Sequence, residues 1–300
     1  MKYPQYLTPG DKVSIVSPAG KIDRQIVERG AEILRNQGFQ VEIGQHAFDI
    51  DNMYAGTDAN RAFDLQKALN DKTVKAVFFS RGGYGSIRTF SHINWSSFFK
   101  KPKWLIGFSD ITVFHAYLTN HHIPSVHGVM ASWFEKDGEL TDSFLKLMAV
   151  LKGEKLIFDV QPHPLNRDGD ATGVLAGGNL SLIQSLRGTS LDISPKGKIL
   201  FIEDIDEHHY NIDRMIQNLK VGKILKQLSG LIAGYYTDMK DGETPFGKSA
   251  YEIIHEAVAH YRYPVIFGFG AGHGLPNHPI IMGSRISLHV TEKQVNIKHL

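Results

Sequence analysis

The sequence contains no cysteine, no long apolar run and no block of basic residues. Without cysteine, the chain has no disulfide bond, no cysteine-ligated zinc and no thiol nucleophile. Its apolar runs are shorter than the about 18 residues that a membrane-spanning helix needs. The formal net charge is only +2, which gives no support to binding of nucleic acid or of a membrane surface.

The remaining composition is that of a folded protein. Hydrophobic residues make up 42% and charged residues 21% of the 300 residues, which is enough for a sizeable core and argues against disorder. A chain of this length favours two domains. The first residues lack the apolar segment of a signal peptide, so we expect a cytoplasmic protein.

The first half of the chain alternates apolar strand-like runs with stretches of helical spacing. The expected strands are 12–17, 39–43, 74–79 and 104–107, and the expected helices are 23–37 and 58–69. This alternation predicts a parallel sheet covered on both faces, in a flavodoxin-like or glutamine-amidotransferase-like α/β domain over residues 1–150. The residues of the second helix expected to face the core are Ala62, Phe63, Leu65, Ala68 and Leu69.

The pattern changes after about residue 150. Residues 151–172 include Pro162, Pro164 and Gly169 and are expected to form a linker. Short strand-like runs follow at 172–176, 198–202, 230–236, 265–269 and 286–290, with helical stretches near 209–228 and 247–260. We therefore expect a strand-rich α+β domain, of the swivelling β-barrel-like kind, over residues 173–300.

Ser109 stands where the fourth expected strand gives way to a helix. Gly107, two residues earlier, permits a sharp bend. A serine on such a turn projects its hydroxyl beyond the sheet edge, beside the first N–H groups of the helix, as a nucleophile requires. The alternative is a helix cap, because serine is a favoured N-cap residue. Residues 18–20 and 81–85 also follow strands, so these segments can line one crevice with Ser109.

Three glycines follow strand 74–79, in the segment Arg-Gly-Gly-Tyr-Gly-Ser at 81–86. Glycine lets the backbone approach a ligand closely and leaves N–H groups as donors. The segment is not a dinucleotide fingerprint, because Arg88 stands where the third glycine of that pattern is needed. It can hold an oxyanion, with Arg81 or Arg88 as partner of a carboxylate, or it can be an ordinary glycine-rich turn.

Two later segments carry residues suited to acid–base chemistry. Glu203 is among the acidic residues that end an apolar strand, where a carboxylate can orient a histidine. The alternative there is a solvated acidic loop or the start of a helix. His273 lies between Gly272 and Gly274 after another strand, which leaves its imidazole accessible as a general base. The alternative for His273 is a purely structural histidine.

No histidine pattern predicts a metal site. His255 and His260 resemble the H-E-x-x-H pattern of zinc proteases, but a spacing of five points the two imidazoles about 140° apart on a helix. The adjacent pairs at 121–122 and 208–209 diverge as well. We therefore expect no metal ion.

Three segments together resemble the LD-carboxypeptidases of peptidase family S66, which include muramoyltetrapeptide carboxypeptidases and the microcin C immunity peptidases. They are Arg-Gly-Gly-Tyr-Gly-Ser-Ile-Arg at 81–88, Gly-Phe-Ser-Asp-Ile-Thr at 107–112 and Gly-His-Gly at 272–274. The likeness extends to segments 17–20, 58–65, 177–180 and 201–204. Seven segments in the same order cover nearly the whole chain and make the resemblance specific.

This resemblance implies a catalytic triad of Ser109, Glu203 and His273. It also implies that the backbone N–H groups of Gly83 and Asp110 form the oxyanion hole. The nucleophile then belongs to the N-terminal domain, and the glutamate and histidine belong to the C-terminal domain. The resemblance thus implies an active site at the domain interface.

The implied activity is that of a serine carboxypeptidase that releases terminal D-alanine from murein tetrapeptide, through an acyl-enzyme and without a cofactor. Arg81, Arg88 and Asn179 are expected to contact the murein peptide, with Arg88 preferred for its terminal carboxylate. One alternative is an immunity-type hydrolase of aminoacyl-nucleotide analogues, but no long nucleotide-recognition insertion is evident. Another is a non-catalytic small-molecule binding protein. We also expect a homodimer, with no nucleic-acid or membrane partner.

Overall fold

The computed structural model describes residues 2–300 and divides into two compact units. The first unit extends to Glu154 and also includes His278–Ile280. The second contains Lys155–Asn277 and Ile281–Leu300. Over residues 2–300, no helix has the length and apolar character needed to cross a membrane.

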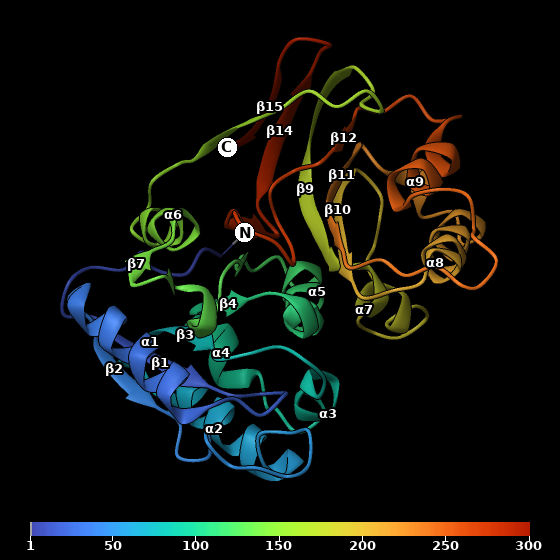
Figure 1. Cartoon of the computed structure of the whole chain (residues 1–300). Helices are drawn as coiled ribbons and strands as arrows, with labels where there is room; N and C mark the ends of the chain where they lie inside the picture. The colour runs from blue at the N-terminus through green and yellow to red at the C-terminus, as the bar shows by residue number, and fades with distance from the viewer. Residues whose placement is uncertain (1) are drawn as a thin grey trace. The chain divides into compact units, whose positions relative to one another are not determined.

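The first unit is built from strands that alternate with helices (Figure 1). Its main strands are β1 (Lys12–Val16), β2 (Gln40–Ile43), β3 (Val74–Phe79), β4 (Trp104–Gly107) and β5 (Ser125–His127). Its helices are α1 (Arg24–Asn36), α2 (Asp58–Asn70), α3 (Ser86–Phe90), α4 (Ser96–Lys100), α5 (Thr112–Asn120) and α6 (Asp142–Leu151). Shorter elements are the 3-10 turns η1 (Ser109–Ile111) and η2 (Ala131–Trp133) and the hairpin of β6 (Glu135–Lys136) and β7 (Glu139–Leu140).

The strand order of this sheet is β2-β1-β3-β4-β5, and β13 (Ile280–Met282) follows β5. The pairs that join β1 through β5 are all parallel. This is the flavodoxin-like order, in which the direction of strand progression reverses between β1 and β3. Ligands of such sheets bind beyond the carboxyl ends of the strands at this reversal, which here is where Pro18–Gly20 and Arg81–Gly85 lie.

Both faces of the sheet are buried because helices cover both. On one face Phe79 of β3 stacks on Phe114 of α5, with ring centroids 5.1 Å apart. On the other face the next side chain along the strand, Phe78, meets Phe134 edge-on at 6.0 Å. Side chains of a strand point alternately to its two faces, so the apolar residues 76–79 of β3 fill two separate cores.

Helix α2 departs from its predicted apolar pattern. The side chain of Phe63 is 51% exposed, so its predicted place in the core is wrong, whereas Arg61 and Asp64 are buried. Arg61 and Leu65 are four residues apart and share a helix face, while Phe63 is two residues from each. Polar partners compensate for the burial: Asp64 accepts a hydrogen bond from the backbone N–H of His46 at 2.7 Å.

The second unit contains a seven-stranded sheet in the order β12-β11-β10-β9-β14-β15-β8. Its strands are β8 (Ile157–Val160), β9 (Gly169–Asn179), β10 (Lys198–Ile205), β11 (Gly230–Thr237), β12 (Val265–Phe267), β14 (Arg285–Val290) and β15 (Val295–His299). The pairs from β9 to β12 are parallel, and the pairs that join β9, β14, β15 and β8 are antiparallel. The other elements are α7 (Leu180–Ser185), α8 (His209–Val221), η3 (Leu225–Gln227) and α9 (Ala250–Val258).

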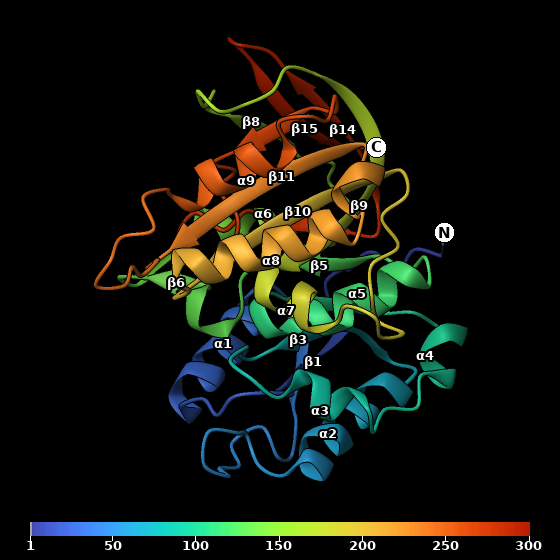
Figure 2. The same cartoon turned by 90° about the vertical axis from the view of Figure 1, so that its right-hand side faces the viewer.

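Helices α7, α8 and α9 lie together beside the parallel part of this sheet, as both views show (Figure 1, Figure 2). A parallel α/β unit and a second strand-rich unit confirm the predicted fold class. The segment expected to be a linker contains β8 and the start of β9, and β8 pairs with β15 from Val160 to Ile157. Its prolines lie between these two strands.

Candidate active site

Ser109 follows β4 and has a left-handed backbone, with φ of +64°. Residues other than glycine rarely adopt this region, at a cost of about 1–3 kcal/mol, and such strain is concentrated at functional sites. The N-cap positions of η1 and α5 are held by Phe108 and Ile111. Ser109 therefore does not occupy the N-cap that the alternative interpretation gave it. A serine on a strained turn from strand to helix is instead the arrangement of a nucleophile elbow.

The glycine-rich loop after β3 lies directly against Ser109. A β-carbon added to Gly82 would lie 3.0 Å from Cβ of Ser109 and 3.4 Å from the backbone nitrogen of Asp110. The backbone N–H of Gly20, after β1, donates to the carbonyl of Gly82 at 3.0 Å, and Gly83 has φ of +92°. The structure thus brings together the three strand-end segments that the sequence singled out in this unit.

The two arginines of this loop are already engaged within the unit. Arg81 Nη1 donates to the carbonyl oxygen of Lys21 at 2.7 Å. Arg88 Nε and Nη2 donate to the two carboxylate oxygens of Asp58 at 3.0 and 2.6 Å. The Arg88 guanidinium is therefore neutralised by a bidentate ion pair, so its predicted role with a substrate carboxylate requires that pair to open.

Glu203 and His273 form a hydrogen-bonded pair in the second unit. Glu203 lies near the carboxyl end of β10 and is fully buried, and its Oε2 is 2.7 Å from Nδ1 of His273. Burial lowers the pKa of His273, but the hydrogen bond and charge of Glu203 outweigh burial and raise it above the ordinary 6.5. A carboxylate on Nδ1 fixes the tautomer in which Nε2 can accept a proton.

Close contacts shape the loop that carries His273. Gly272 has φ of +116°, and a β-carbon added to it would lie 2.6 Å from Oε2 of Glu203. The hydroxyl of Thr237, at the end of β11, donates to the carbonyl of His273 at 2.5 Å. The backbone N–H of Gly272 donates to Oδ1 of Asn277 at 3.0 Å. The loop therefore allows the imidazole to approach the carboxylate because position 272 has no side chain.

Gly272→Ala is expected to lower the free energy of unfolding by about 1–3 kcal/mol or more, because the new β-carbon meets both backbone strain and the Glu203 carboxylate. The matched control is Gly268→Ala, since Gly268 also has a left-handed φ, +75°, but an added β-carbon would have no neighbour within 4 Å. Urea unfolding of the two variants measures the difference. Equal losses would show that Gly272 is needed for backbone conformation alone.

Asp204, the next residue along β10, holds the start of α7. It accepts hydrogen bonds from the Asn179 amide at 2.9 Å and from the backbone N–H and hydroxyl of Ser181 at 2.9 and 2.7 Å. Burial raises the pKa of Asp204 to about 6, aided by the charge of Glu203 and opposed by these hydrogen bonds. The side-chain oxygen Oδ1 of Asn179 also caps α7 by accepting a hydrogen bond from the backbone N–H of Leu182 at 3.1 Å. Asn179, expected to contact substrate, is thus held in a buried position.

A buried serine–histidine pair lies in the first unit, at the carboxyl end of β4. The hydroxyl of Ser125 is 2.7 Å from Nδ1 of His115, whose Nε2 donates to the carbonyl of Gly107 at 2.9 Å. Both residues are fully buried, and burial lowers the pKa of His115 to about 4. This histidine supports the strand end before Ser109 and lacks the buried carboxylate that accompanies His273.

Metal ligation finds no support in the described part of the chain. Over residues 2–300, no group of three or more histidine, aspartate or glutamate side chains is placed to hold a metal ion.

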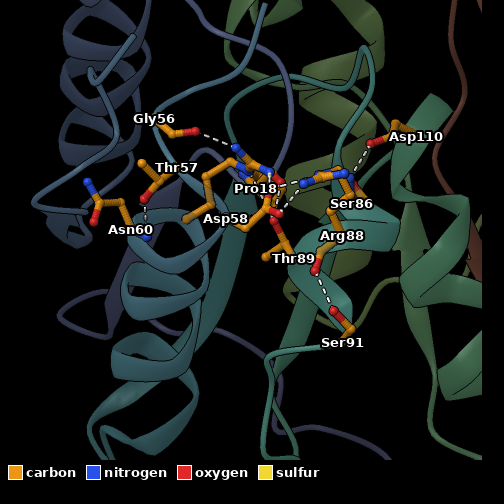
Figure 3. Close-up of polar contacts among 11 residues, drawn as sticks. Pro18, Gly56, Thr57, Asp58, Asn60, Ser86, Arg88, Thr89, Ser91 and Asp110 are labelled. Carbon is orange, nitrogen blue, oxygen red and sulfur yellow. Dashed lines mark hydrogen bonds and ion pairs between the residues drawn. The ribbon is translucent and has the colours of Figure 1, made fainter. Parts of the chain in front are cut away.

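Two polar side chains of the first unit, those of Asp110 and Arg61, were not selected from the sequence, which indicated only the backbone N–H of Asp110. The carboxylate of Asp110 is fully buried and accepts the Ser86 N–H at 2.7 Å (Figure 3). Arg61 is 1% exposed and donates from Nε to the hydroxyl of Thr89 at 3.1 Å. A signal for Arg61 was available, because its spacing to Leu65 places a cation within the apolar stripe of α2. No local pattern indicates the contact of Asp110.

Comparison with known proteins identifies relatives of both units. Residues 13–128 match the model of the LD-carboxypeptidase N-terminal domain, and residues 172–288 match that of the LD-carboxypeptidase C-terminal domain. A probable murein peptide carboxypeptidase of Bacillus subtilis is 31% identical over 301 residues, covering 98% of this chain and 94% of that protein.

Solved structures agree with these matches. The muramoyltetrapeptide carboxypeptidase from Oxalobacter formigenes superposes with a TM-score of 0.86 at 25% identity, over 96% of this chain and 98% of that one. The microcin C7 self immunity protein MccF superposes with a TM-score of 0.87 at 20% identity, over 99% of this chain and 98% of that one. At that identity the second likeness shows a shared fold.

Proposed function

Because this chain belongs to peptidase family S66, the LD-carboxypeptidases, we propose that it releases the terminal D-alanine of murein tetrapeptide. The observation that carries this proposal is the strained Ser109 at the carboxyl end of β4, beside the loop of Gly82 and the backbone N–H of Asp110. The names of the relatives in Bacillus subtilis and Oxalobacter formigenes support the choice of a murein peptide as substrate. We also propose a cytoplasmic location and, as the resemblance implies, a homodimer.

In the proposed reaction Ser109 is the nucleophile and His273 is the general base. The Ser109 hydroxyl attacks the carbonyl carbon of the L,D-amide bond and gives its proton to Nε2 of His273. The backbone N–H groups of Gly83 and Asp110 donate to the oxyanion. His273 then protonates the departing amine of D-alanine. In the second half of the reaction, His273 takes a proton from water, which attacks the ester of the acyl-enzyme, and the proton returns to Ser109 as the shortened peptide leaves. Glu203 holds the imidazole tautomer and stabilises the imidazolium.

An exopeptidase must also bind the free carboxylate of the terminal residue. We propose Arg81 for this contact in preference to Arg88. Arg88 is already paired with both oxygens of Asp58, whereas Arg81 donates to a neutral backbone carbonyl. A guanidinium paired with a carbonyl keeps its full charge for a carboxylate.

Activity is expected to fall as the pH drops through a value above 6.5, because the raised pKa of His273 keeps the imidazole protonated, and so unable to accept a proton, up to a higher pH. The rate kcat/KM measured against pH reports this value for the enzyme without substrate. Glu203→Gln removes the carboxylate whose hydrogen bond and charge are the main interactions that raise the pKa of His273, and it leaves burial, which lowers that pKa. An NMR titration of the imidazole should therefore show a lower pKa in that variant.

The control for this titration is Asp170→Asn. Asp170 lies 2.8 Å from Nδ1 of the exposed His289, so the variant removes a carboxylate from a different histidine. This variant should leave the fall of kcat/KM at low pH unchanged. An unchanged His273 titration in Glu203→Gln would contradict the assigned pair.

Turnover of two substrates side by side tests the proposed specificity. Murein tetrapeptide and an aminoacyl sulfamoyl adenosine both contain an amide or acyl bond that the same residues can attack. We expect the tetrapeptide to give the higher kcat/KM. Preference for the nucleotide analogue would assign the chain to the immunity-type activity, for which the shared fold with MccF is the supporting observation.

A further inference from the structure

The carboxylate of Asp110 links the nucleophile turn to the glycine-rich loop. We propose that Asp110 is a positioning residue, which aligns the two backbone donors of the oxyanion hole by holding Ser86 through its side chain. This inference rests on the proposed function, because it assumes that the N–H groups of Gly83 and Asp110 meet the oxyanion. It assigns a task to a side chain, whereas the proposed reaction uses only the backbone of that residue.

Asp110 thus contacts the glycine-rich loop on both sides of Gly83, at Gly82 and at Ser86. The backbone nitrogen of Asp110 lies beside Gly82, 3.4 Å from the place of an added β-carbon. The side chain of the same residue accepts the N–H of Ser86 at 2.7 Å, with no exposed surface. Ser86 is the first residue of α3 and follows the loop that carries Gly83. A displacement of the Asp110 carboxylate therefore shifts one donor relative to the other.

The far end of α3 is fixed by a separate set of contacts (Figure 3). The hydroxyl of Thr89 donates to the carbonyl of Pro18 at 2.7 Å and accepts from Nε of Arg61 at 3.1 Å. Arg61 also donates to Gly56 and Asp58. These contacts anchor α3 to α2 and to the segment after β1. The Asp110 carboxylate adds the link to the turn that carries Ser109.

The buried environment of the Asp110 carboxylate lowers the stability of the folded protein. Burial raises the pKa of Asp110, and the hydrogen bonds of the Ser86 region and the charge of Arg61 offset this only in part. A buried acceptor of this kind is destabilising unless its hydrogen bonds are well formed. A neutral apolar side chain would pack in the same place without that cost, but it could not hold the Ser86 N–H.

Asp64, in the same unit, is a matched control for Asp110, because it is a buried carboxylate that contacts none of the proposed catalytic groups. Asp64 is 3% exposed, and it also accepts one backbone N–H, that of His46, at 2.7 Å. Burial raises its pKa as well. Asp64 holds the segment after β2, which carries none of the proposed catalytic groups. A purely structural role of Asp110 predicts that the two carboxylates give the same result when removed.

The test compares Asp110→Ala, Asp110→Asn and Asp64→Ala in the full chain, with murein tetrapeptide as substrate. We expect Asp110→Ala to lower kcat about 10²-fold, the size of effect that a small misplacement of catalytic groups produces, with little change in KM. Asp110→Asn keeps an acceptor oxygen and should recover most of that loss. Asp64→Ala should lower the melting temperature comparably and keep kcat.

A second readout follows the nucleophile directly. A serine-directed phosphonate labels Ser109 through a similar oxyanion, so Asp110→Ala should slow labelling by a similar factor. If Asp110→Ala does not fold, Asp110→Asn should still show a lower kcat and slower labelling than the wild type. The inference is overturned if either Asp110 variant, once folded, matches wild-type kcat, or if Asp64→Ala loses as much kcat as Asp110→Ala. Failure of the proposed function itself gives a different result, namely a Ser109→Ala variant that keeps activity.

Discussion

Ser109→Ala is expected to lower the release of D-alanine from murein tetrapeptide by at least about 10⁴-fold, because no other group in the proposed mechanism can form the acyl-enzyme. The protein should remain folded, since alanine is smaller than serine and the turn conformation at φ +64° is retained by the surrounding loop. Chromatographic assay of free D-alanine measures the rate. Circular dichroism and thermal unfolding check that the variant is folded.

The matched control is Ser125→Ala, which removes a buried serine hydroxyl that contacts a histidine within the same unit. It leaves Nδ1 of His115 without that partner, at a cost of about 1–3 kcal/mol in stability, but it should keep the rate. A serine-directed phosphonate should label the wild type and Ser125→Ala at Ser109 and should not label Ser109→Ala. Activity of Ser109→Ala within tenfold of wild type (roughly 1.4 kcal/mol in barrier height) would reject Ser109 as nucleophile.

His273→Ala is the second large effect, again a loss of about 10⁴-fold or more in kcat, because the general base also becomes the acid that protonates the leaving amine. Removing the imidazole takes away the group that lies 2.7 Å from the Glu203 carboxylate. That carboxylate has no exposed surface, so water cannot replace the lost partner. Stability is therefore expected to fall as well, because a buried acceptor is left without its hydrogen-bond donor. Rates and unfolding curves of the variant measure both effects.

His289→Ala provides the comparison for this variant. His289 is also paired with a carboxylate, Asp170, but both side chains are exposed. An exposed pair contributes little to stability, so we expect wild-type rates and nearly wild-type unfolding. A His273→Ala variant that is as active as His289→Ala would show that another group serves as base.

Local sequence signals predicted much of the fold because they reflect contacts between near neighbours. The run Val74–Phe79 forms a strand with the predicted bounds. Helix α1 spans Arg24–Asn36 within the predicted 23–37, and its N-cap is Asp23, whose side chain accepts from the N–H of Gln25. In both cases the spacing of the apolar residues carried enough information.

Local signals failed where distant segments decide burial. Phe63 is exposed and Arg61 is buried, and one polar partner of Arg61, Thr89, comes from another helix. Strand β8 lies in a segment with the composition of a connection, and its place in the sheet depends on pairing with β15, more than a hundred residues later in the chain. Neither partner can be identified from the spacing of residues in a short window.

The candidate site divides in the same way. Glycine and serine patterns after strands are enough to single out Ser109 and the loop at 81–85, because these signals lie within a few residues of each other. The pairing of Glu203 with His273 joins residues that are 70 positions apart, and only the family resemblance predicts it. Arg88 is the instructive case, because its position beside the loop suggests a substrate contact, whereas its ion pair with Asp58 comes from α2.

Mass spectrometry of the products from murein tri-, tetra- and pentapeptides is the decisive test of the proposed activity. We expect the tetrapeptide to lose one alanine residue, recovered as free D-alanine, and the tripeptide and pentapeptide to remain intact. Ser109→Ala, incubated in parallel, should leave the tetrapeptide uncleaved. An intact tetrapeptide with the folded wild-type protein, or cleavage at any other bond, would contradict the proposal that this chain is an LD-carboxypeptidase of murein peptides.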